Sequence, residues 1–268
     1  MRILTRRDTG LLTQWTFGTA GLDADAVAFL TAANITNTTQ QNAIFTLVLN
    51  LKSFGLWTKC KAIYPIIGST STNQKYNLKD PRDLDAAYRL FFSGGWTHSD
   101  NGATPNGINS FANTFLNASI MTPNSEHIST YSRTTTITGL TEVGLITYTA
   151  GKISYVMIQH NTTNRYVANQ GTDVLISATP TTGQGLTISN RVNVINVQRY
   201  LNNVKLELPN AGGGVGNLNY FLSAINGTGT FGTCQVAFAS IGDGFTDTEA
   251  TNFYNSVLAF QTTLGRNV

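Results

Sequence analysis

Between residues 66 and 241 the chain is divided into short runs of alternating apolar and polar side chains, separated by turn-forming residues. Alternation with a period of two is typical of strands that bury one face, and regularly spaced short strands favour a β-sandwich or jelly roll. The clearest pair is RYLNNVKLEL, residues 199–208, where Asn202 and Asn203 can both take the positive φ of a two-residue hairpin turn. We expect strands at residues 75–78, 87–92, 108–114, 127–135, 141–146, 153–160, 165–168, 174–177, 186–197, 204–208, 219–224 and 235–241.

The residues before this region have helical patterns instead. Residues 24–33 place apolar side chains on one face, and a second amphipathic helix can begin at a cap formed by Thr38 or Thr39. Residues 56–64 continue as a short helical turn. We therefore expect residues 21–65 to form a helical segment that packs on the sandwich.

The chain closes with a C-terminal helix within residues 243–268. Thr246 and Glu249 have the spacing of a capping box, in which each side chain bonds the backbone amide of the other residue. The helix then presents an apolar face until Gly265 and should cover one end of the sandwich. The expected fold is mainly β, with the sandwich in residues 66–242 and this helix in the same domain.

The composition excludes several classes of function. Only 12% of the residues are charged, and 17 basic and 14 acidic residues leave a net charge of +3. Basic side chains cluster only near the N-terminus, without the aromatic platform of single-strand binders, so we expect no sequence-specific nucleic-acid binding. No apolar run has the length of a transmembrane helix, so we expect no membrane insertion. No signal peptide is recognisable, so we expect synthesis in the cytoplasm, with release only by lysis.

Residues 1–20 form an N-terminal arm in which apolar residues follow no clean period. Chain ends stay disordered unless a partner or the body of the protein holds them. We expect this arm to dock on a neighbouring subunit or back on its own domain. The side chains expected to make that assembly contact are Arg2, Arg6, Arg7, Trp15 and Phe17.

Three stretches resemble a module of tailed-bacteriophage virion proteins. They are IYPIIGSTSTNQKYNLKDPRDLDAAYRL, FFSGGWTHSDNGATPNGINSFANT and the ending FASIGDGFTDTEATNFYNSVLAFQTTLGRNV, and the resemblance covers residues 22–268. The module is similar to the concanavalin A-like (laminin-G-like) jelly roll and forms part of tail-fibre, receptor-binding or other structural proteins. The resemblance therefore implies a concanavalin A-like sandwich, a location on the virion, other virion proteins as partners, and a homo-oligomer.

Residues that could carry catalysis form no recognisable motif. Retaining glucanases of the concanavalin-like fold use two glutamates four residues apart, with carboxyl groups roughly 5 Å apart. The glutamates of this chain, Glu126, Glu142, Glu207 and Glu249, are all distant from one another in sequence. No serine or cysteine lies in a nucleophile elbow. We expect no enzymatic activity, and a glycan hydrolase is the least favoured alternative.

Metal and cofactor binding are not indicated either. Cys60 and Cys234 lack the spacing of metal ligands and are expected as buried free thiols, although their spacing does not exclude a disulfide. Asp100, Asp173 and Asp243 are possible calcium donors, but calcium prefers six to eight oxygens and no cluster supplies them. We expect no tight metal site and no cofactor.

The strongest candidate for a binding site lies in residues 93–107, a polar, glycine-rich stretch that we expect to be a loop between two strands. A sugar can stack its apolar face on an exposed aromatic ring while amides, carboxylates and backbone groups bond its hydroxyls. The candidate glycan-binding residues are Trp96, His98, Asp100, Asn101, Asn106 and Asn109. The competing interpretation is a buried tryptophan beside asparagines that only form turns.

Together these features predict a non-enzymatic bacteriophage virion protein that is exposed on the particle and binds a host-surface glycan or receptor. The alternative is a capsid-decorating or tail-assembly protein without a ligand. The two hypotheses differ in whether the rim formed by residues 93–107 is free or buried against another subunit.

Overall fold

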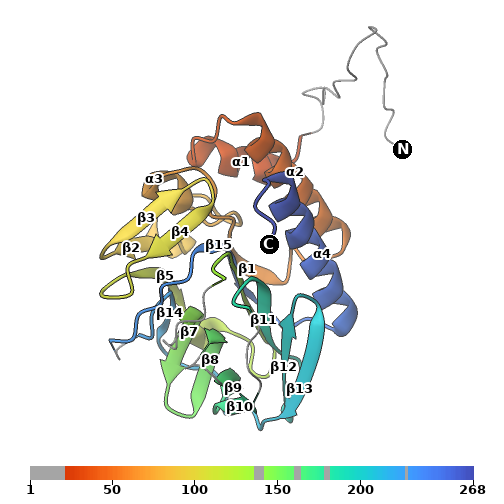
Figure 1. Cartoon of the computed structure of the whole chain (residues 1–268). Coiled ribbons are helices and arrows are strands. Elements are labelled where there is room, and N and C mark those ends of the chain that lie inside the picture. Colours follow the sequence, from red (N-terminus) through yellow and green to blue (C-terminus); the bar gives the residue numbers. More distant parts are fainter. Residues whose placement is uncertain (1–21, 136–141, 160–163, 178–181, 227–228) are drawn as a thin grey trace, which may run out of the picture.

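The computed structural model describes residues 22–135, 142–159, 164–177, 182–226 and 229–268. In this part of the chain two antiparallel sheets pack against each other, and helices cover the outer side of one sheet (Figure 1). The mainly β sandwich predicted from the alternating pattern is confirmed, as are helices before and after it. The predicted assembly arm, residues 1–20, lies outside the described residues.

The first sheet is built around β15 (Val236–Gly242), a buried strand near the end of the chain. Its order is β13-β12-β11-β6-β15-β4-β3, and β1 also pairs with β15. The pairing brings early and late segments of the chain together in one sheet. Its other strands are β1 (Cys60–Tyr64), β3 (Trp96–Ser99), β4 (Gly102–Pro105), β6 (Glu126–Ser132), β11 (Gly185–Arg191), β12 (Asn196–Leu201) and β13 (Val204–Pro209).

The second sheet has the order β10-β9-β8-β7-β14-β5-β2. Strand β14 comes from the last third of the chain and lies between β7 and β5. It therefore sets side chains from two distant segments next to each other on one sheet face. The strands are β2 (Phe91–Ser93), β5 (Phe111–Asn117), β7 (Glu142–Thr149), β8 (Lys152–Gln159), β9 (Asn164–Gly171), β10 (Val174–Ser177) and β14 (Asn219–Leu222).

Three helices cover the outer face of the first sheet: α1 (Ala24–Ala32), α2 (Thr38–Ser53) and α4 (Asp247–Thr263). Helices α2 and α4 run side by side at the right of Figure 1. Their apolar faces share one buried cluster with Tyr131, Ile188 and Phe238 of the sheet. Short helical turns occur at α3 (Ser71–Gln74), η1 (Asp85–Ala87) and η2 (Ala118–Ile120). Among the described helices, none is long and apolar enough to cross a bilayer.

The predicted helix caps agree with the structure except at one residue. Thr246 and Glu249 form both hydrogen bonds of the predicted capping box at the start of α4. Helix α2, however, is capped by Asn37 and not by Thr38 or Thr39. An asparagine side chain is as good a cap as a threonine, so the sequence did not distinguish these neighbouring positions.

The hairpin formed by β12 and β13 follows the sequence prediction. Asn202 and Asn203 have φ angles of 47° and 67°, as a two-residue hairpin turn requires. The strands then pair from Leu201 opposite Val204 without a register shift. Strand β13 forms one edge of the first sheet.

Several segments differ from the expected secondary structure. The expected strand at residues 186–197 is divided into β11 and β12 by bends at residues 192–195. Cys60–Tyr64 form β1 within the segment expected to be helical, because their apolar side chains fit a fully buried strand that pairs with β15. Residues 75–78 form a turn in place of a strand, with an isolated bridge at Asn77. The predicted strand at residues 87–92 is reduced to β2, because η1 precedes it and Tyr88 has a left-handed φ of 59°.

A polar network is buried between the two sheets. Glu126 on β6 is inaccessible to solvent, and Ser154 Oγ (2.5 Å) and the Tyr220 hydroxyl donate hydrogen bonds to its carboxyl group. Burial raises the pKa of Glu126 to about 7, although these hydrogen bonds and the charge of Arg191 oppose the rise. Arg191 is also buried and donates to the Asn210 carbonyl oxygen at 2.9 Å. These hydrogen bonds join β6 of the first sheet to β8 and β14 of the second sheet.

Cys60 and Cys234 are buried free thiols, which confirms the expectation from their spacing. Cys60 lies on β1 and not on the expected helical turn. Burial raises the pKa of the Cys60 thiol to about 12, so this residue is neutral near pH 7 and acts as a small apolar side chain.

Candidate functional site

The predicted loop at residues 93–107 contains a β-hairpin. Strands β3 and β4 pair with Trp96 opposite Pro105 and Ser99 opposite Gly102, at the edge of the first sheet. Gly102 has a φ of 132°, and a Cβ atom there would lie 2.3 Å from the Val236 carbonyl oxygen. Only glycine allows this approach, so the hairpin is fixed against β15. The glycines that suggested a loop instead permit a close contact between strands.

The hairpin separates the six predicted glycan-binding residues into two groups. Asp100 and Asn101 form the turn between β3 and β4, and Gln40 of α2 donates a hydrogen bond to Asp100 Oδ1 at 3.1 Å. Trp96 lies at the opposite end of β3. With a rise of about 3.3 Å per strand residue, the two ends are roughly 10 Å apart. One small sugar therefore does not contact Trp96 and the Asp100 turn together.

Trp96 belongs to an aromatic cluster that closes the side of the hairpin. Its ring centroid lies 5.1 Å from that of Phe92 and 6.2 Å from that of His98. Its Nε1 donates to the backbone carbonyls of Ser93 (2.9 Å) and Phe111 (3.3 Å). The indole is half-buried and its single donor is already used, so it has no donor left for a ligand.

His98 is held in place by a side chain from the neighbouring turn. Its Nδ1 lies 2.7 Å from Gln74 Oε1, and burial lowers the pKa of the imidazole. The ring is therefore neutral near pH 7, and Nδ1 donates to the glutamine oxygen. His98 supports the aromatic cluster from within the hairpin.

Asn106 and Asn109 build the turn that follows β4. Asn106 Oδ1 accepts hydrogen bonds from the Ile108 and Asn109 amides (2.9 and 3.1 Å) and from Ser110 Oγ (2.7 Å). Asn109 Oδ1 accepts from Asn106 Nδ2 at 2.8 Å and from the Gly95 amide at 3.3 Å. Both side-chain oxygens and Asn106 Nδ2 are occupied within the protein, whereas Asn109 Nδ2 has no acceptor within the described chain.

A different surface combines aromatic rings with amides, on the outer face of the second sheet. In β5, residues at even positions point into the sandwich, whereas Phe111, Asn113, Phe115 and Asn117 are half-exposed. Strands β2 and β14 flank β5 and contribute further rings and amides to the same face. We call this surface the phenylalanine platform; it consists of Phe91, Phe111, Phe115 and Phe221 together with Asn113, Asn117 and Asn219.

Strand register places Asn113 at the centre of the phenylalanine platform. It lies directly opposite Phe91 on β2 and opposite Phe221 on β14. Phe111 stacks on Phe221, with ring centroids 4.8 Å apart and planes 7° from parallel. Phe115 meets Phe91 edge to face at 6.4 Å. Aromatic rings therefore surround one amide on all sides of this sheet face.

The asparagines of the platform are joined to one another and keep one donor free. Asn113 Oδ1 accepts from the Phe115 amide (2.9 Å) and from Asn219 Nδ2 (3.3 Å). Asn117 Nδ2 donates to Asn219 Oδ1 at 3.2 Å. Within the described chain, Asn113 Nδ2 has no acceptor, so this donor at the centre of the platform is available to a ligand.

The platform is exposed and uncharged. Phe91 is 52% exposed, the largest exposure among its rings, and the other rings are half-buried. No charged residue occupies an outward position of β2, β5 or β14. Sequence reasoning missed this site because it depends on β14, although the alternation of phenylalanine and asparagine in FANTFLN was a visible signal.

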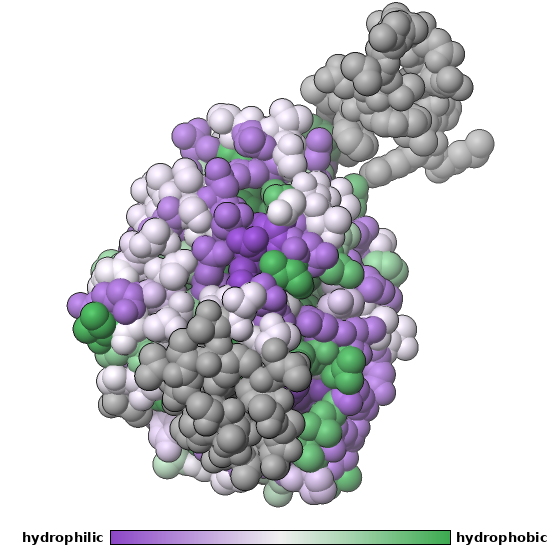
Figure 2. Space-filling model, in the orientation of Figure 1, coloured by the Kyte–Doolittle hydropathy of each residue, from purple (hydrophilic) through white to green (hydrophobic). Residues whose placement is uncertain are grey.

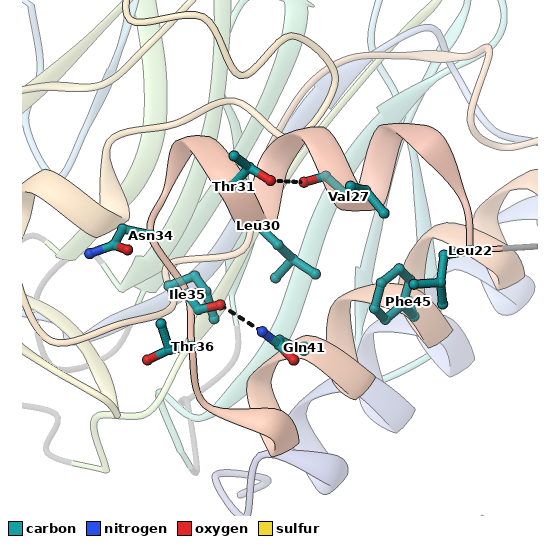
Figure 3. Close-up of a pocket in the computed structure, with 9 residues that line it drawn as sticks. All are labelled: Leu22, Val27, Leu30, Thr31, Asn34, Ile35, Thr36, Gln41 and Phe45. Atoms are coloured by element: carbon teal, nitrogen blue, oxygen red, sulfur yellow. Dashed lines mark hydrogen bonds between the residues drawn. The ribbon is translucent and has the colours of Figure 1, made fainter. Parts of the chain in front are cut away.

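A groove lies between α1 and α2 (Figure 3). Leu30, Ile35 and Phe45 make it mainly apolar, and Gln41 Nε2 donates to the Ile35 carbonyl oxygen at 2.9 Å. None of its lining residues is charged. The groove contains no arrangement of acids, bases or metal ligands that indicates chemistry.

The glutamates with described side chains serve structural roles. Glu126 is buried between the sheets, and Lys205 Nζ lies 2.7 Å from Glu207. Glu249 caps α4 and pairs with Lys59 at 2.6 Å. In the described part of the chain, no three histidine, cysteine, aspartate or glutamate residues are close enough to hold a metal ion.

The comparisons with known proteins define the fold and no family. No protein-family model and no curated protein sequence matches the chain. A similar solved structure is domain 4 of AbnA, a GH43 extracellular arabinanase from Geobacillus stearothermophilus in complex with arabinotriose, with 16% identity and a TM-score of 0.48 over 73% of this chain and 98% of that one.

Two further structures are similar to parts of larger chains. The botulinum neurotoxin serotype D binding domain has 8% identity and a TM-score of 0.50, over 75% of this chain and 53% of that one. Trypanosoma rangeli sialidase in complex with sialic acid has 8% identity and a TM-score of 0.49, over 81% of this chain and 39% of that one. At 8% identity, the likeness to the toxin binding domain shows the fold alone, which is a β-sandwich.

Proposed function

We propose that this chain is a non-enzymatic glycan-binding module of a bacteriophage virion, exposed on the particle, and that the phenylalanine platform contacts the sugar. The observation that carries the proposal is the placement of Asn113, with a free Nδ2 donor, between Phe91 and Phe221 on an exposed sheet face. The virion location rests on the sequence resemblance. The binding function rests on the chemistry of the platform.

The platform has the two kinds of group that a neutral sugar needs. A pyranose or furanose ring has an apolar C–H face, which gains free energy when it leaves water and packs on an aromatic ring. Its hydroxyl groups require donors and acceptors, and a side-chain amide supplies both. Because the platform carries no charge, it favours an uncharged saccharide over an acidic one.

The environments of the glutamates support a binding role in preference to hydrolysis. Glycoside hydrolysis by the common mechanism needs two carboxyl groups that flank one glycosidic bond. Glu126 is enclosed between the sheets, whereas Glu207 and Glu249 are each held by a lysine. None of these three side chains offers a free carboxylate next to the platform.

The test is binding of the purified protein to an array of host-surface glycans, followed by calorimetry with the best ligand. Phe91→Ala should weaken binding about two- to twelvefold, since one aromatic contact contributes about 0.5–1.5 kcal/mol. Ile108→Ala is the matched control, because Ile108 is 75% exposed and lies outside the platform. Its binding should equal that of the wild type.

A further variant separates the platform from the hairpin. If Trp96→Ala abolishes binding while Phe91→Ala leaves it unchanged, the sugar binds at the β3–β4 hairpin and the platform proposal is wrong. If the wild-type protein binds no glycan and no host cells, the structural alternative, a decorating or tail-assembly protein without a ligand, replaces the binding proposal. Thermal unfolding of each variant confirms that the fold is intact.

A further inference from the structure

Strand β13 is an exposed edge of the first sheet. It has six residues, compared with four in β3, four in β10 and three in β2, which are the other sheet edges. Proteins commonly protect such edges with bulges, prolines or charged side chains, and β13 carries Lys205 and Glu207. The pairing of β12 with β13 has no bulge, and the only proline is the last residue, Pro209. The strand therefore presents a straight set of free backbone groups.

The hairpin turn determines which backbone groups are free. In a two-residue hairpin the residues that flank the turn, here Leu201 and Val204, exchange both backbone hydrogen bonds. The bonded positions then alternate, so Leu206 also bonds to β12. Lys205 and Glu207 direct their N–H and C=O groups away from the sheet, toward solvent.

The exposed side chains of β13 are sorted by face. Val204 is 73% exposed and Leu206 is 36% exposed, and both lie on the face shared with Leu208. Ile195, which is 64% exposed, lies beside the end of the strand because its carbonyl accepts from the Asn210 amide. Figure 2 shows hydrophobic side chains at the lower right margin of the molecule, where β13 lies in Figure 1.

The charged residues on the opposite face complement one another when the strand meets its own copy. Lys205 and Glu207 are two residues apart, and within the chain Lys205 Nζ lies 2.7 Å from Glu207 and 2.9 Å from Asp247, so the partner's charges add to contacts that already exist. In an antiparallel pair centred on Leu206, Lys205 lies opposite Glu207 of the partner subunit, and the reverse contact forms by symmetry. The free N–H and C=O groups of these same residues then form four hydrogen bonds across the axis.

We propose that β13 pairs with β13 of a second copy of this chain, about a two-fold axis through Leu206. The first sheets of the two subunits become continuous, opposite charges face each other, and Val204, Leu206 and Leu208 join one apolar stripe across the interface. A dimer of this kind carries two phenylalanine platforms, so it increases avidity for a surface that displays many copies of a glycan. The pairing itself does not depend on the proposed glycan function.

Charge reversal tests both the interface and its register. In a dimer of either variant, Lys205→Glu or Glu207→Lys, position 205 of each subunit faces a like charge at position 207 of the other. Each variant should raise the dimer dissociation constant at least about tenfold, as measured by sedimentation equilibrium or light scattering. Arg82→Glu is the matched control, since Arg82 is exposed and far from β13 in sequence and sheet. It should dimerise like the wild type.

Mixing the two variants provides the decisive comparison. Equimolar Lys205→Glu and Glu207→Lys should form a heterodimer, because each position 205 then faces an opposite charge at position 207. The double variant should regain homodimerisation for the same reason. A wild-type chain that remains monomeric at its solubility limit, with the mass of 28.9 kDa, overturns the proposal. A dimer that both single variants leave unchanged overturns it too, because the interface then lies elsewhere.

Discussion

Glu126 and His127 are adjacent on β6 and should make opposite contributions to the pH dependence of stability. Burial raises the pKa of Glu126 to about 7 from 4.5. Burial lowers the pKa of His127 to about 4 from 6.5. His127 Nδ1 donates to the Asp243 carbonyl oxygen (2.7 Å), and its Nε2 accepts from Ser240 Oγ (3.0 Å), an arrangement that suits the neutral ring.

The sign follows from the protons bound in each state. Between pH 4.5 and 7 the folded protein retains a proton on Glu126 that the unfolded chain has lost, so the Glu126 contribution to stability falls as pH rises. Between pH 4 and 6.5 the unfolded chain binds a proton at His127 that the folded protein does not, so that contribution rises. Each slope is about 1.4 kcal/mol per pH unit, and the two cancel where the ranges overlap.

Glu126→Gln removes one of the two slopes. The stability of this variant relative to the wild type should increase by about 3 kcal/mol in total as pH rises from 4.5 to 7, given a slope of about 1.4 kcal/mol per unit. Urea unfolding at a series of pH values measures both free energies at one ionic strength. Exposed carboxylates titrate equally in both proteins and drop out of the difference. An identical pH slope in the two proteins would refute the assignment of Glu126.

Three other substitutions test separate parts of the fold, each by chemical unfolding. Arg266→Leu should cost about 3 kcal/mol or more, because the buried carbonyl oxygens of Pro65, Ile66 and Ala237 each lose a donor at 2.8 Å and a buried unsatisfied group costs about 1–3 kcal/mol; a loss below about 1 kcal/mol contradicts this role. Thr246→Ala should cost about 1 kcal/mol through loss of the α4 cap, and an unchanged midpoint would show that the cap is dispensable. Gly102→Ala should destabilise the β3–β4 hairpin by about 2 kcal/mol or more, because its Cβ would meet the Val236 carbonyl; wild-type stability would argue against the close strand contact.

Elements governed by local interactions could be predicted from the sequence. The Asn202–Asn203 hairpin and the capping box of α4 depend on residues within a few positions of each other, and the structure has both. The alternation of β5 was also visible, although the strand begins at Phe111 and not at residue 108.

Elements governed by distant pairing could not be predicted. Cys60–Tyr64 form a strand because β15, near the other end of the chain, hydrogen-bonds to them. Likewise, the glycines at 94 and 95 suggested a loop, yet β3 pairs with β4 and Gly94 packs against the Asn109 backbone. The phenylalanine platform depends on the same kind of pairing, since Phe221 reaches Asn113 only through the β14–β5 register. A single sequence does not show which distant segments pair with one another as strands.

The most direct measurement of the central claim is an NMR titration of the dimer or monomer with the best saccharide from the glycan array. The side-chain amide signals of asparagine report the two candidate surfaces separately. The proposal predicts that Asn113 and Asn219 shift most and saturate together with the calorimetric binding curve. Shifts confined to Asn106 and Asn109 would place the sugar on the hairpin turn and contradict the assignment of the phenylalanine platform.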